Sequence, residues 1–235
     1  MSVTIGIIAL TSLISLLSFS NNALKEQLIF SPYSHLNEKK WWLVITHGFI
    51  HADYLHLIFN MYVLYIFGGN VERFFLQTSK VGYLYFIILY IGGMIFATLP
   101  SLIKHRNNPN YKSLGASGAV AAIVFVFIAL SPISKMGLII LPGIYIPAFI
   151  FGVLYLIAEN YMSRKGTTNI AHDAHIAGAI FGLVFLGGYD YKLYIKFFDT
   201  IINYIGIGWK NRYTYIKENC FDKRNQSRNF QTKWI

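Results

Sequence analysis

The sequence predicts an all-α, polytopic membrane protein. Of its 235 residues, 55% are hydrophobic and only 13% are charged, whereas soluble domains carry about 25% charged residues. The hydrophobic residues form long blocks rather than amphipathic stripes, and a single domain accounts for a chain of this length. The charges fall in loops and in the C-terminal tail. The formal net charge of +10 therefore concerns membrane topology and anionic lipid, and we expect no nucleic-acid partner.

Six apolar segments are expected to cross the bilayer: residues 3–19, 55–69, 81–99, 117–130, 136–158 and 174–186. The length of the first segment falls within the spanning range of about 17–25 residues. No Lys or Arg precedes it, whereas a signal peptide begins with positive charge. Residues 101–114 read as a polar loop. Pro142 and Pro147 should distort the fifth segment, because proline removes a backbone donor.

The regions outside these segments have interfacial character. The connection of residues 20–54 contains Trp41 and Trp42, which are typical of an aromatic anchor at the membrane surface. Beyond residue 187, polar residues follow one stripe of an apolar segment, which favours a helix lying on the membrane over a seventh span.

The expected topology has both termini in the cytoplasm, because six spans return the chain to its starting side. The tail after the sixth segment holds nine Lys and Arg against four Asp and Glu, which marks that side as cytoplasmic. The loops after the second and fourth segments agree, whereas the basic loop after the third does not. We expect a multi-pass integral protein of a bacterial inner (cell) membrane.

Ser117 opens the fourth segment, in the run Gly115-Ala116-Ser117-Gly118. Backbone N–H groups at a helix start are unpaired and carry partial positive charge, so a nucleophile there can use them as an oxyanion hole. For this run alone, a helix N-cap serine is the favoured interpretation. A 14-residue helix rises only about 21 Å, less than the roughly 30 Å of hydrocarbon, so Ser117 should be recessed in a water-filled cavity.

His175 is the second polar residue in apolar surroundings. It precedes Gly178 and Gly182, a small-residue face that lets helix backbones approach closely, so Ser117 Oγ could reach a ring nitrogen of His175. An imidazole is the usual activator of serine, while a helix–helix hydrogen bond is the structural alternative. Asp173 lies only two residues from His175 and should point elsewhere. We therefore predict a Ser–His dyad without a carboxylate.

His56 and Asn60 are four residues apart in the second segment, so both should lie on one helix face. Both can donate hydrogen bonds to a developing oxyanion, alongside the backbone N–H of Ser117. His51 precedes them in the same run.

A metal site is the main chemical alternative for the histidines. The candidate ligands are His47, His51, His56, His172 and His175. No His-Glu-x-x-His sequence occurs, and no cysteine lies near a histidine, so a standard zinc ligand set is lacking. We expect no metal and no cofactor.

Together these residues resemble the rhomboid family of intramembrane serine proteases, over approximately residues 41–188. The matching runs lie at residues 51–60, 115–118 and 174–182, in the family's order. The resemblance implies a six-helix rhomboid-like bundle with Ser117 as nucleophile and His175 as general base. It further implies an oxyanion hole of His56, Asn60 and the Ser117 amide. The supporting residues would be Gly115, Gly118, His51, Gly178 and Gly182.

The resemblance also assigns the remaining segments. The loop with Trp41 and Trp42 would be half submerged, and the fifth helix would gate the substrate. The sequence departs from the family at Leu43, where arginine is frequent, and at Ala121, where an aromatic residue often stacks on the histidine.

The implied organisation has three parts: residues 1–40 with the first membrane helix and the start of the first loop, the catalytic core 41–188, and the interfacial segment and polar cytoplasmic tail 189–235. The implied function is a serine endopeptidase that cleaves single-span or multi-span membrane proteins in the lipid bilayer. The alternatives are an inactive rhomboid-like protein that binds and escorts membrane proteins, and a small transporter or metal-binding membrane protein.

Overall fold

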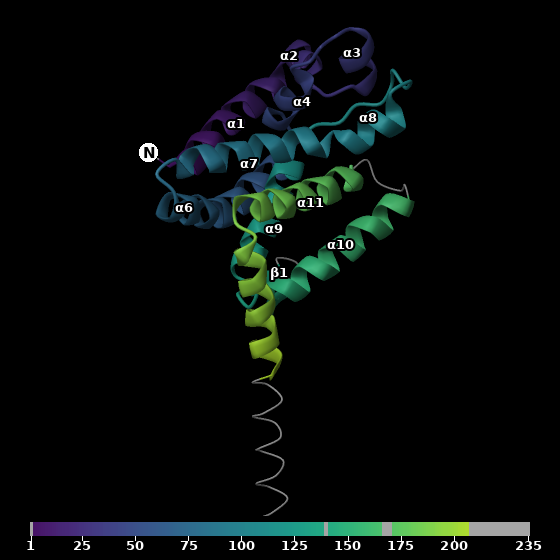
Figure 1. Ribbon diagram of the computed structural model, residues 1–235. Coiled ribbons are helices and arrows are strands. Elements are labelled where there is room, and N and C mark those ends of the chain that lie inside the picture. The colour runs from purple at the N-terminus through teal and green to yellow at the C-terminus, as the bar shows by residue number, and fades with distance from the viewer. Residues whose placement is uncertain (1, 139–140, 166–170, 207–235) are drawn as a thin grey trace, which may run out of the picture.

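The computed structural model describes residues 2–138, 141–165 and 171–206, and these residues are mostly helical (Figure 1). The N-terminal half contains α1 (Val3–Ser20), α2 (Asn22–Leu28), α3 (Pro32–Asn37), α4 (Leu43–Thr46), the short η1 (His47–Phe49), α5 (Tyr54–Val63), the π-helical η2 (Leu64–Gly68), α6 (Gly69–Thr78), α7 (Gly82–Ala97) and α8 (Leu99–His105). The rest contains α9 (Ser117–Leu130), the strands β1 (Lys135–Leu138) and β2 (Leu141–Pro147), α10 (Ala148–Lys165) and α11 (His172–Tyr189).

Helix α9 is the centre of the bundle. Every residue of α9 is buried except Ser117, Phe127 and Leu130. A helix that is apolar all round must be enclosed by other elements, and α7 and α11 supply most of this enclosure. The small residues of α9 allow close approach: a Cβ placed on Gly93 of α7 would lie 2.8 Å from the Cβ of Ala122.

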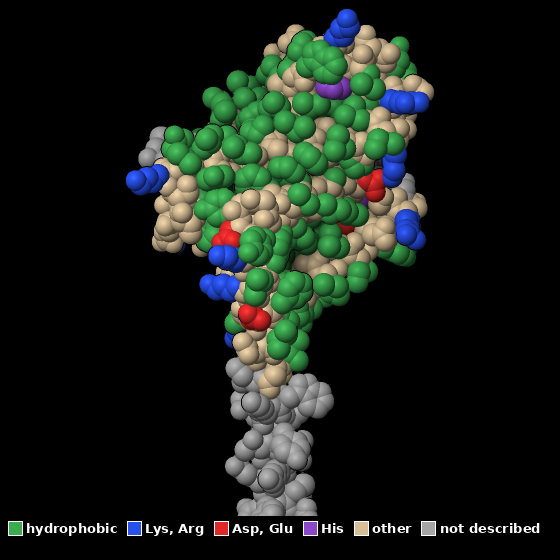
Figure 2. All heavy atoms as spheres, in the orientation of Figure 1, with side chains coloured by type: hydrophobic (Ala, Val, Ile, Leu, Met, Phe, Trp, Pro, Cys, Tyr) green, Lys and Arg blue, Asp and Glu red, His purple; other side chains and the backbone are tan. Residues whose placement is uncertain are grey.

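Helix α1 has its polar side turned inward. Its buried residues are all hydroxyl-bearing, namely Thr4, Thr11, Ser15 and Ser18. Its leucines face outward, and Figure 2 shows hydrophobic side chains over much of the visible surface, with few charges among them. Apolar residues facing outward and hydroxyls facing inward suit a helix in lipid, where the polar groups must find partners inside the bundle.

Glu72 fastens α1 to α6. This carboxylate is 4% exposed and accepts hydrogen bonds from the Ser2 hydroxyl (2.6 Å), the Val3 amide (2.7 Å), and both the amide (2.9 Å) and hydroxyl (2.6 Å) of Thr4. The donors form the start of α1, where unpaired N–H groups attract a negative charge. Glu72 therefore caps a helix distant in sequence.

Three expected segments agree with observed helices. The first and sixth coincide with α1 and α11 to within a few residues, and the fourth coincides with α9 at both ends. The second continues past its expected end at residue 69 to Thr78, because its polar residues have partners: Asn70 donates to the Ile66 carbonyl (2.7 Å), and Glu72 caps α1.

The third segment is also longer than expected, and the polar loop predicted for residues 101–114 begins later. Helices α7 and α8 together form one apolar helix, Gly82–His105. A turn at Thr98 separates α7 from α8, so Pro100 lies in the first turn of α8, where proline is tolerated.

The prediction of a helix over residues 136–158 is wrong in its first half. β1 and β2 form an antiparallel pair, with Met136 opposite Ile146 and Gly137 opposite Tyr145. Gly143 has φ = +89°, outside the helical region. Pro147 ends β2 and directly precedes α10, a position in which it costs no helical hydrogen bond. The helix then continues seven residues beyond the expected end at Ala158, to Lys165.

Two helices in the described residues, Val3–Ser20 and Gly82–His105, are long and apolar enough to cross a membrane. A third candidate is α11 joined to the helix Lys192–Gly206, although the two are bent by 112° at their junction. Helix α9 is apolar but shorter. The expected count of six spans is therefore not established by length and composition. The bend separates the segment after residue 190 from α11. The polar tail after residue 206 lies outside the described residues.

Candidate active site

Ser117 is the first residue of α9, and the backbone before it is shaped by glycine. Gly115 has φ = +111°, a left-handed conformation that glycine adopts without steric cost. Its amide donates to the carbonyl of His47 in η1 (2.9 Å), which holds the turn against η1. The N-cap position is occupied by Ala116, which has no side-chain cap. The N-cap interpretation of Ser117 is therefore wrong, and its hydroxyl is available for another partner.

That partner is His175, in the first turn of α11. His175 Nε2 lies 2.7 Å from Ser117 Oγ, a hydrogen-bond distance between residues 58 positions apart. Both side chains are partly exposed. This is the spacing required of a nucleophile and its general base.

Glycine faces hold α9 and α11 at this separation. A Cβ on Gly178 would lie 2.0 Å from the Gly118 carbonyl oxygen, and a Cβ on Gly182 would lie 2.3 Å from the Ala122 carbonyl oxygen. Gly118 is similarly close to Ala97 of α7, with 2.2 Å from a Cβ to the Ala97 Cβ. The backbones of α9 and α11 are therefore in direct contact one turn from His175.

The sequence-based expectation that no carboxylate approaches His175 is wrong. Glu159, on α10, places Oε1 3.1 Å from His175 Nδ1 and Oε2 2.6 Å from His172 Nδ1. The 3.1 Å contact is not aligned as a hydrogen bond, and His175 Nδ1 is buried. A carboxylate in an apolar helix was the available signal, but the predicted helix ended at Ala158 and left Glu159 outside it.

Asp173 is engaged elsewhere, as its position on the helix predicts. Its two oxygens accept from the Ser163 hydroxyl and pair with Lys104, so it links α11 to α10 and α8. Of the two carboxylates near the start of α11, Glu159 therefore contacts the histidines, whereas Asp173 contacts Ser163 and Lys104.

His56 and Asn60 lie on α5, beside the Gly115 turn. A Cβ on Gly115 would lie 2.7 Å from His56 Cε1, so the His56 ring packs against the backbone that leads to Ser117. Asn60 is 3% exposed, and its amide donates to the His56 carbonyl (2.9 Å). Asp53 caps α5 by accepting from the His56 amide (2.8 Å). These contacts fix the residues proposed to donate to an oxyanion.

His51 connects three elements. Its Nδ1 is 2.9 Å from the Ser15 hydroxyl of α1, its Nε2 accepts from the Ala116 amide (3.4 Å), and its ring contacts that of His56 edge-on (4.9 Å between centroids). The residue is fully buried. These contacts give His51 a supporting position behind the Gly115 turn.

The candidate metal ligands fall into two places. Glu159, His172 and His175 offer ligand atoms within 4.8 Å of one another. His47 and His51 do not join such a group among the described residues: His47 Nδ1 bonds to the Leu43 carbonyl (2.8 Å), and His51 bonds as described above.

The two residues that depart from the family pattern, Leu43 and Ala121, are both buried. Leu43 begins α4 and is 2% exposed, so it is packed inside the first loop. Ala121 is 5% exposed within α9 and provides no ring beside His175. Trp41 and Trp42 are 60% and 52% exposed, as expected for a surface anchor.

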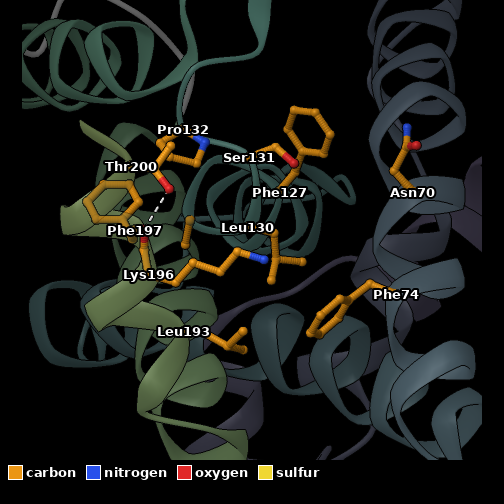
Figure 3. Close-up of a pocket in the computed structure, with 11 residues that line it drawn as sticks. Asn70, Phe74, Phe127, Leu130, Ser131, Pro132, Leu193, Lys196, Phe197 and Thr200 are labelled. Atoms are coloured by element: carbon orange, nitrogen blue, oxygen red, sulfur yellow. Dashed lines mark hydrogen bonds between the residues drawn. The ribbon is translucent and has the colours of Figure 1, made fainter. Parts of the chain in front are cut away.

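A cavity of about 210 Å³ lies at the other end of α9, away from Ser117 (Figure 3). It is lined by Asn70, Phe74, Phe127, Ala129, Leu130, Ser131, Pro132, Leu193, Lys196, Phe197 and Thr200. Lys196 extends toward Leu130 in this view. The 14 residues of α9 separate this cavity from the Ser117–His175 contact by about 20 Å.

The fold and site define a helical membrane protein with a serine and a histidine in hydrogen-bond contact at one end of a buried central helix. The chain belongs to the rhomboid family, whose domain matches residues 38–189. The rhomboid protease GlpG of Haemophilus influenzae is 29% identical over 169 residues, covering 71% of this chain and 78% of that protein.

Two mitochondrial relatives are similar over shorter shares of their length. Presenilin-associated rhomboid-like protein A of Danio rerio is 26% identical over 172 residues, covering 68% of this chain and 40% of that protein. RHOMBOID-like protein 12 of Arabidopsis thaliana is 30% identical over 151 residues, covering 58% of this chain and 43% of that protein. This chain thus matches less than half the length of either mitochondrial protein.

Proposed function

We propose that this chain is an intramembrane serine endopeptidase in which Ser117 is the nucleophile and His175 the general base. The observation that carries the proposal is the 2.7 Å contact between Ser117 Oγ and His175 Nε2. It is supported by membership of the rhomboid family and by relatives named rhomboid proteases.

The proposed reaction moves one proton between these two residues. His175 Nε2 takes the hydroxyl proton of Ser117 as Oγ attacks the carbonyl carbon of the scissile peptide bond. The resulting tetrahedral intermediate collapses when His175 returns that proton to the leaving amine, which leaves an acyl-serine. Water then attacks the acyl group, with His175 again taking and returning a proton. The nucleophile and the general base both come from the chain, so the proposal needs no cofactor.

The oxyanion of the intermediate would be held by the Ser117 amide with His56 and Asn60. The Ser117 N–H belongs to the first turn of α9, where N–H groups have no intrahelical acceptor. The His56 ring lies against the Gly115 turn that precedes this amide. The three donors therefore come from two elements packed on one another. Gly115, Gly118, His51, Gly178 and Gly182 would support the geometry, for the packing reasons given above.

The proposed substrates are single-span or multi-span membrane proteins within the bilayer. The outward faces of several helices are apolar, with Leu13 57% and Val184 68% exposed. Such exposed apolar faces suit contact with lipid tails. The relatives named rhomboid proteases favour a peptide bond in a membrane segment as the target.

We also propose the topology: six spans, both termini in the cytoplasm and the membrane of a bacterial cell as location. The broken helix from α5 through α6 and the helices α9 and α10 would supply three spans in addition to the candidates α1, α7 with α8, and α11. The three-part division at residues 40 and 188 remains part of this proposal, and the bend after α11 supports its second boundary.

The test uses the full chain in detergent or proteoliposomes, with tagged single-span membrane proteins as substrates. Ser117→Ala and His175→Ala should each abolish cleavage, and the double variant should be no worse because the residues act as a unit. A fluorophosphonate should label wild type and not Ser117→Ala. Robust cleavage by Ser117→Ala would end the proposal. Binding of substrates without cleavage or labelling would favour the inactive escort protein instead.

A further inference from the structure

We infer that Glu159 is a positioning residue for His175, so that the reacting group is a Ser117–His175–Glu159 triad rather than a dyad. The inference rests on the protease function proposed above. The three side chains come from α9, α11 and α10 and form one line: Ser117 Oγ lies 2.7 Å from His175 Nε2, and His175 Nδ1 lies 3.1 Å from Glu159 Oε1.

A carboxylate at the second ring nitrogen would assist a general base in two ways. It accepts the Nδ1–H, which leaves Nε2 unprotonated and able to take the Ser117 hydroxyl proton. After that transfer the ring is a cation, and Glu159, still ionised, stabilises it. Glu159 moves no proton itself. Because the His175 side chain is only 15% exposed, bulk solvent would stabilise the positive ring less than it does a free imidazolium.

The Glu159–His175 contact is close but is not aligned as a hydrogen bond. His175 Nδ1 is buried and has no well-aligned acceptor, although Glu159 Oε1 is within 3.1 Å. Hydrogen bonds of catalytic groups are often poorly aligned without substrate and tighten in the complex.

Glu159 is itself held in place. Its Oε2 lies 2.6 Å from His172 Nδ1, so the two oxygens serve two histidines of α11. The His172, Glu159 and His175 side chains are 6%, 13% and 15% exposed. A carboxylate inside an apolar helix requires such partners, and its placement between two histidines is specific.

The same three side chains could instead bind a divalent cation. A cation on His175 Nδ1 would displace the Glu159 carboxylate from that nitrogen. The structure favours direct pairing, because both carboxylate oxygens already contact histidine nitrogens. The two possibilities differ in their response to chelators, which the experiment uses.

The test compares Glu159→Gln with a neighbouring carboxylate that serves other partners. Glutamine keeps the shape and an acceptor oxygen but removes the charge. We expect kcat for cleavage and the rate of fluorophosphonate labelling to fall together by about 10²–10⁴-fold, the scale for loss of a triad carboxylate, with KM and Tm close to wild type. Glu159→Asp should recover part of the rate. Asp173→Asn, whose carboxylate contacts Ser163 and Lys104, should lose no more than about threefold, as expected for a structural surface contact.

Several results would overturn the inference. Wild-type kcat and labelling in Glu159→Gln would do so, and so would equal losses in Asp173→Asn. A loss that follows Tm and recovers on cooling would make Glu159 structural only. Inhibition of wild type by a chelator, reversed by zinc, would replace the triad with a metal site. If Ser117→Ala and His175→Ala are inactive while Glu159→Gln is active, only the triad fails; activity in Ser117→Ala removes the protease as well.

Discussion

Helices α11 and α10 both bring a side chain to the end of α9, but they pack against it in different ways. On the α11 side the backbones touch: Cβ atoms on Gly178 and Gly182 would lie 2.0 Å and 2.3 Å from carbonyl oxygens of α9. On the α10 side the contact is between side chains: a Cβ on Gly152 would lie 3.2 Å from the Ile128 Cδ1 atom.

The rest of α10 is bound more loosely than α11. Its buried residues are only Ala148 and Gly152, both near its start. Its later part reaches α11 through polar contacts, from Glu159 to two histidines and from Ser163 to Asp173. In Figure 1, α10 lies at the edge of the bundle, beside α11.

The difference shows which distances in the site are rigid. Packed backbones cannot separate by a few tenths of an ångström without repacking a whole seam, so the Ser117–His175 distance is fixed by α9 and α11. The Glu159–His175 distance depends on side chains with rotatable bonds, so it can change with substrate or with movement of α10. Substitutions on the two seams should therefore have unequal effects.

Gly178→Leu should have the largest effect. Its side chain would enter space occupied by the Gly118 carbonyl, and even Gly178→Ala places a Cβ 2.0 Å from that oxygen. Unfolding free energy should fall by about 1–3 kcal/mol or more. Cleavage should fall by at least about 10²-fold, since a displacement of about 1 Å can cost that much. The measurements are a thermal melt and a cleavage assay on one preparation.

Gly188→Ala is the matched control, because nothing lies within 4 Å of a Cβ at that position of α11. It should melt and cleave as wild type does. A Gly178→Leu protein with unchanged melting temperature and activity would show that this face meets lipid. The direct backbone contact between α9 and α11 would then have to be abandoned.

Variants of α5 should lower kcat without loosening the packing of α9 against α10 or α11. His56→Ala and Asn60→Ala should each lower kcat by about 10²–10³-fold if each is an effective oxyanion donor. The Ser117–His175 contact should persist, so fluorophosphonate labelling should be slowed rather than lost. Steady-state kinetics and labelling rates on the two variants make the comparison. Full activity in both would restrict α5 to a structural part.

Gly182→Ala should have a smaller effect on activity than Gly178→Ala, although the clash is similar. Its Cβ would lie 2.3 Å from the Ala122 carbonyl oxygen, one turn farther from His175. Unfolding free energy should fall by about 1–3 kcal/mol, while cleavage falls by about 10-fold or less, since the displacement at His175 is smaller. Equal activity losses for the two alanine variants would show that the seam moves as one rigid unit.

Gly152→Ala should have the smallest effect, because the neighbouring Ile128 Cδ1 is the end of a flexible side chain. Alanine favours a helix over glycine by about 0.5–1 kcal/mol, so Tm should be unchanged or slightly raised. Cleavage should stay within about twofold, as for changes outside packed contacts. A large loss here would mean that α10 packs as tightly as α11 and would erase the contrast between the seams.

The class of fold and much of the local structure follow from the amino-acid sequence alone. Long apolar blocks with few charges predicted membrane helices, and the residue limits of α9 followed from Gly115, Ser131 and the run between them. The glycine spacing on α11 predicted a close approach to α9, and the structure shows it. These features are local, since composition and helical periodicity specify which face of a helix can touch another. The roles of Ser117, His175, His56 and Asn60 remain predictions.

Which distant side chains meet depends on how the helices pack in three dimensions. Glu159 reaches His175, and Glu72 caps α1, because separate helices cross at particular heights and angles, which no short run of sequence records. The hairpin before α10 also depends on tertiary packing, since an apolar run with prolines is compatible with either a strand or a distorted helix. The length of α10 also depends on tertiary contacts. The helix continues past Ala158 because Glu159 and Ser163 have polar partners on α11, and this continuation places Glu159 at the site.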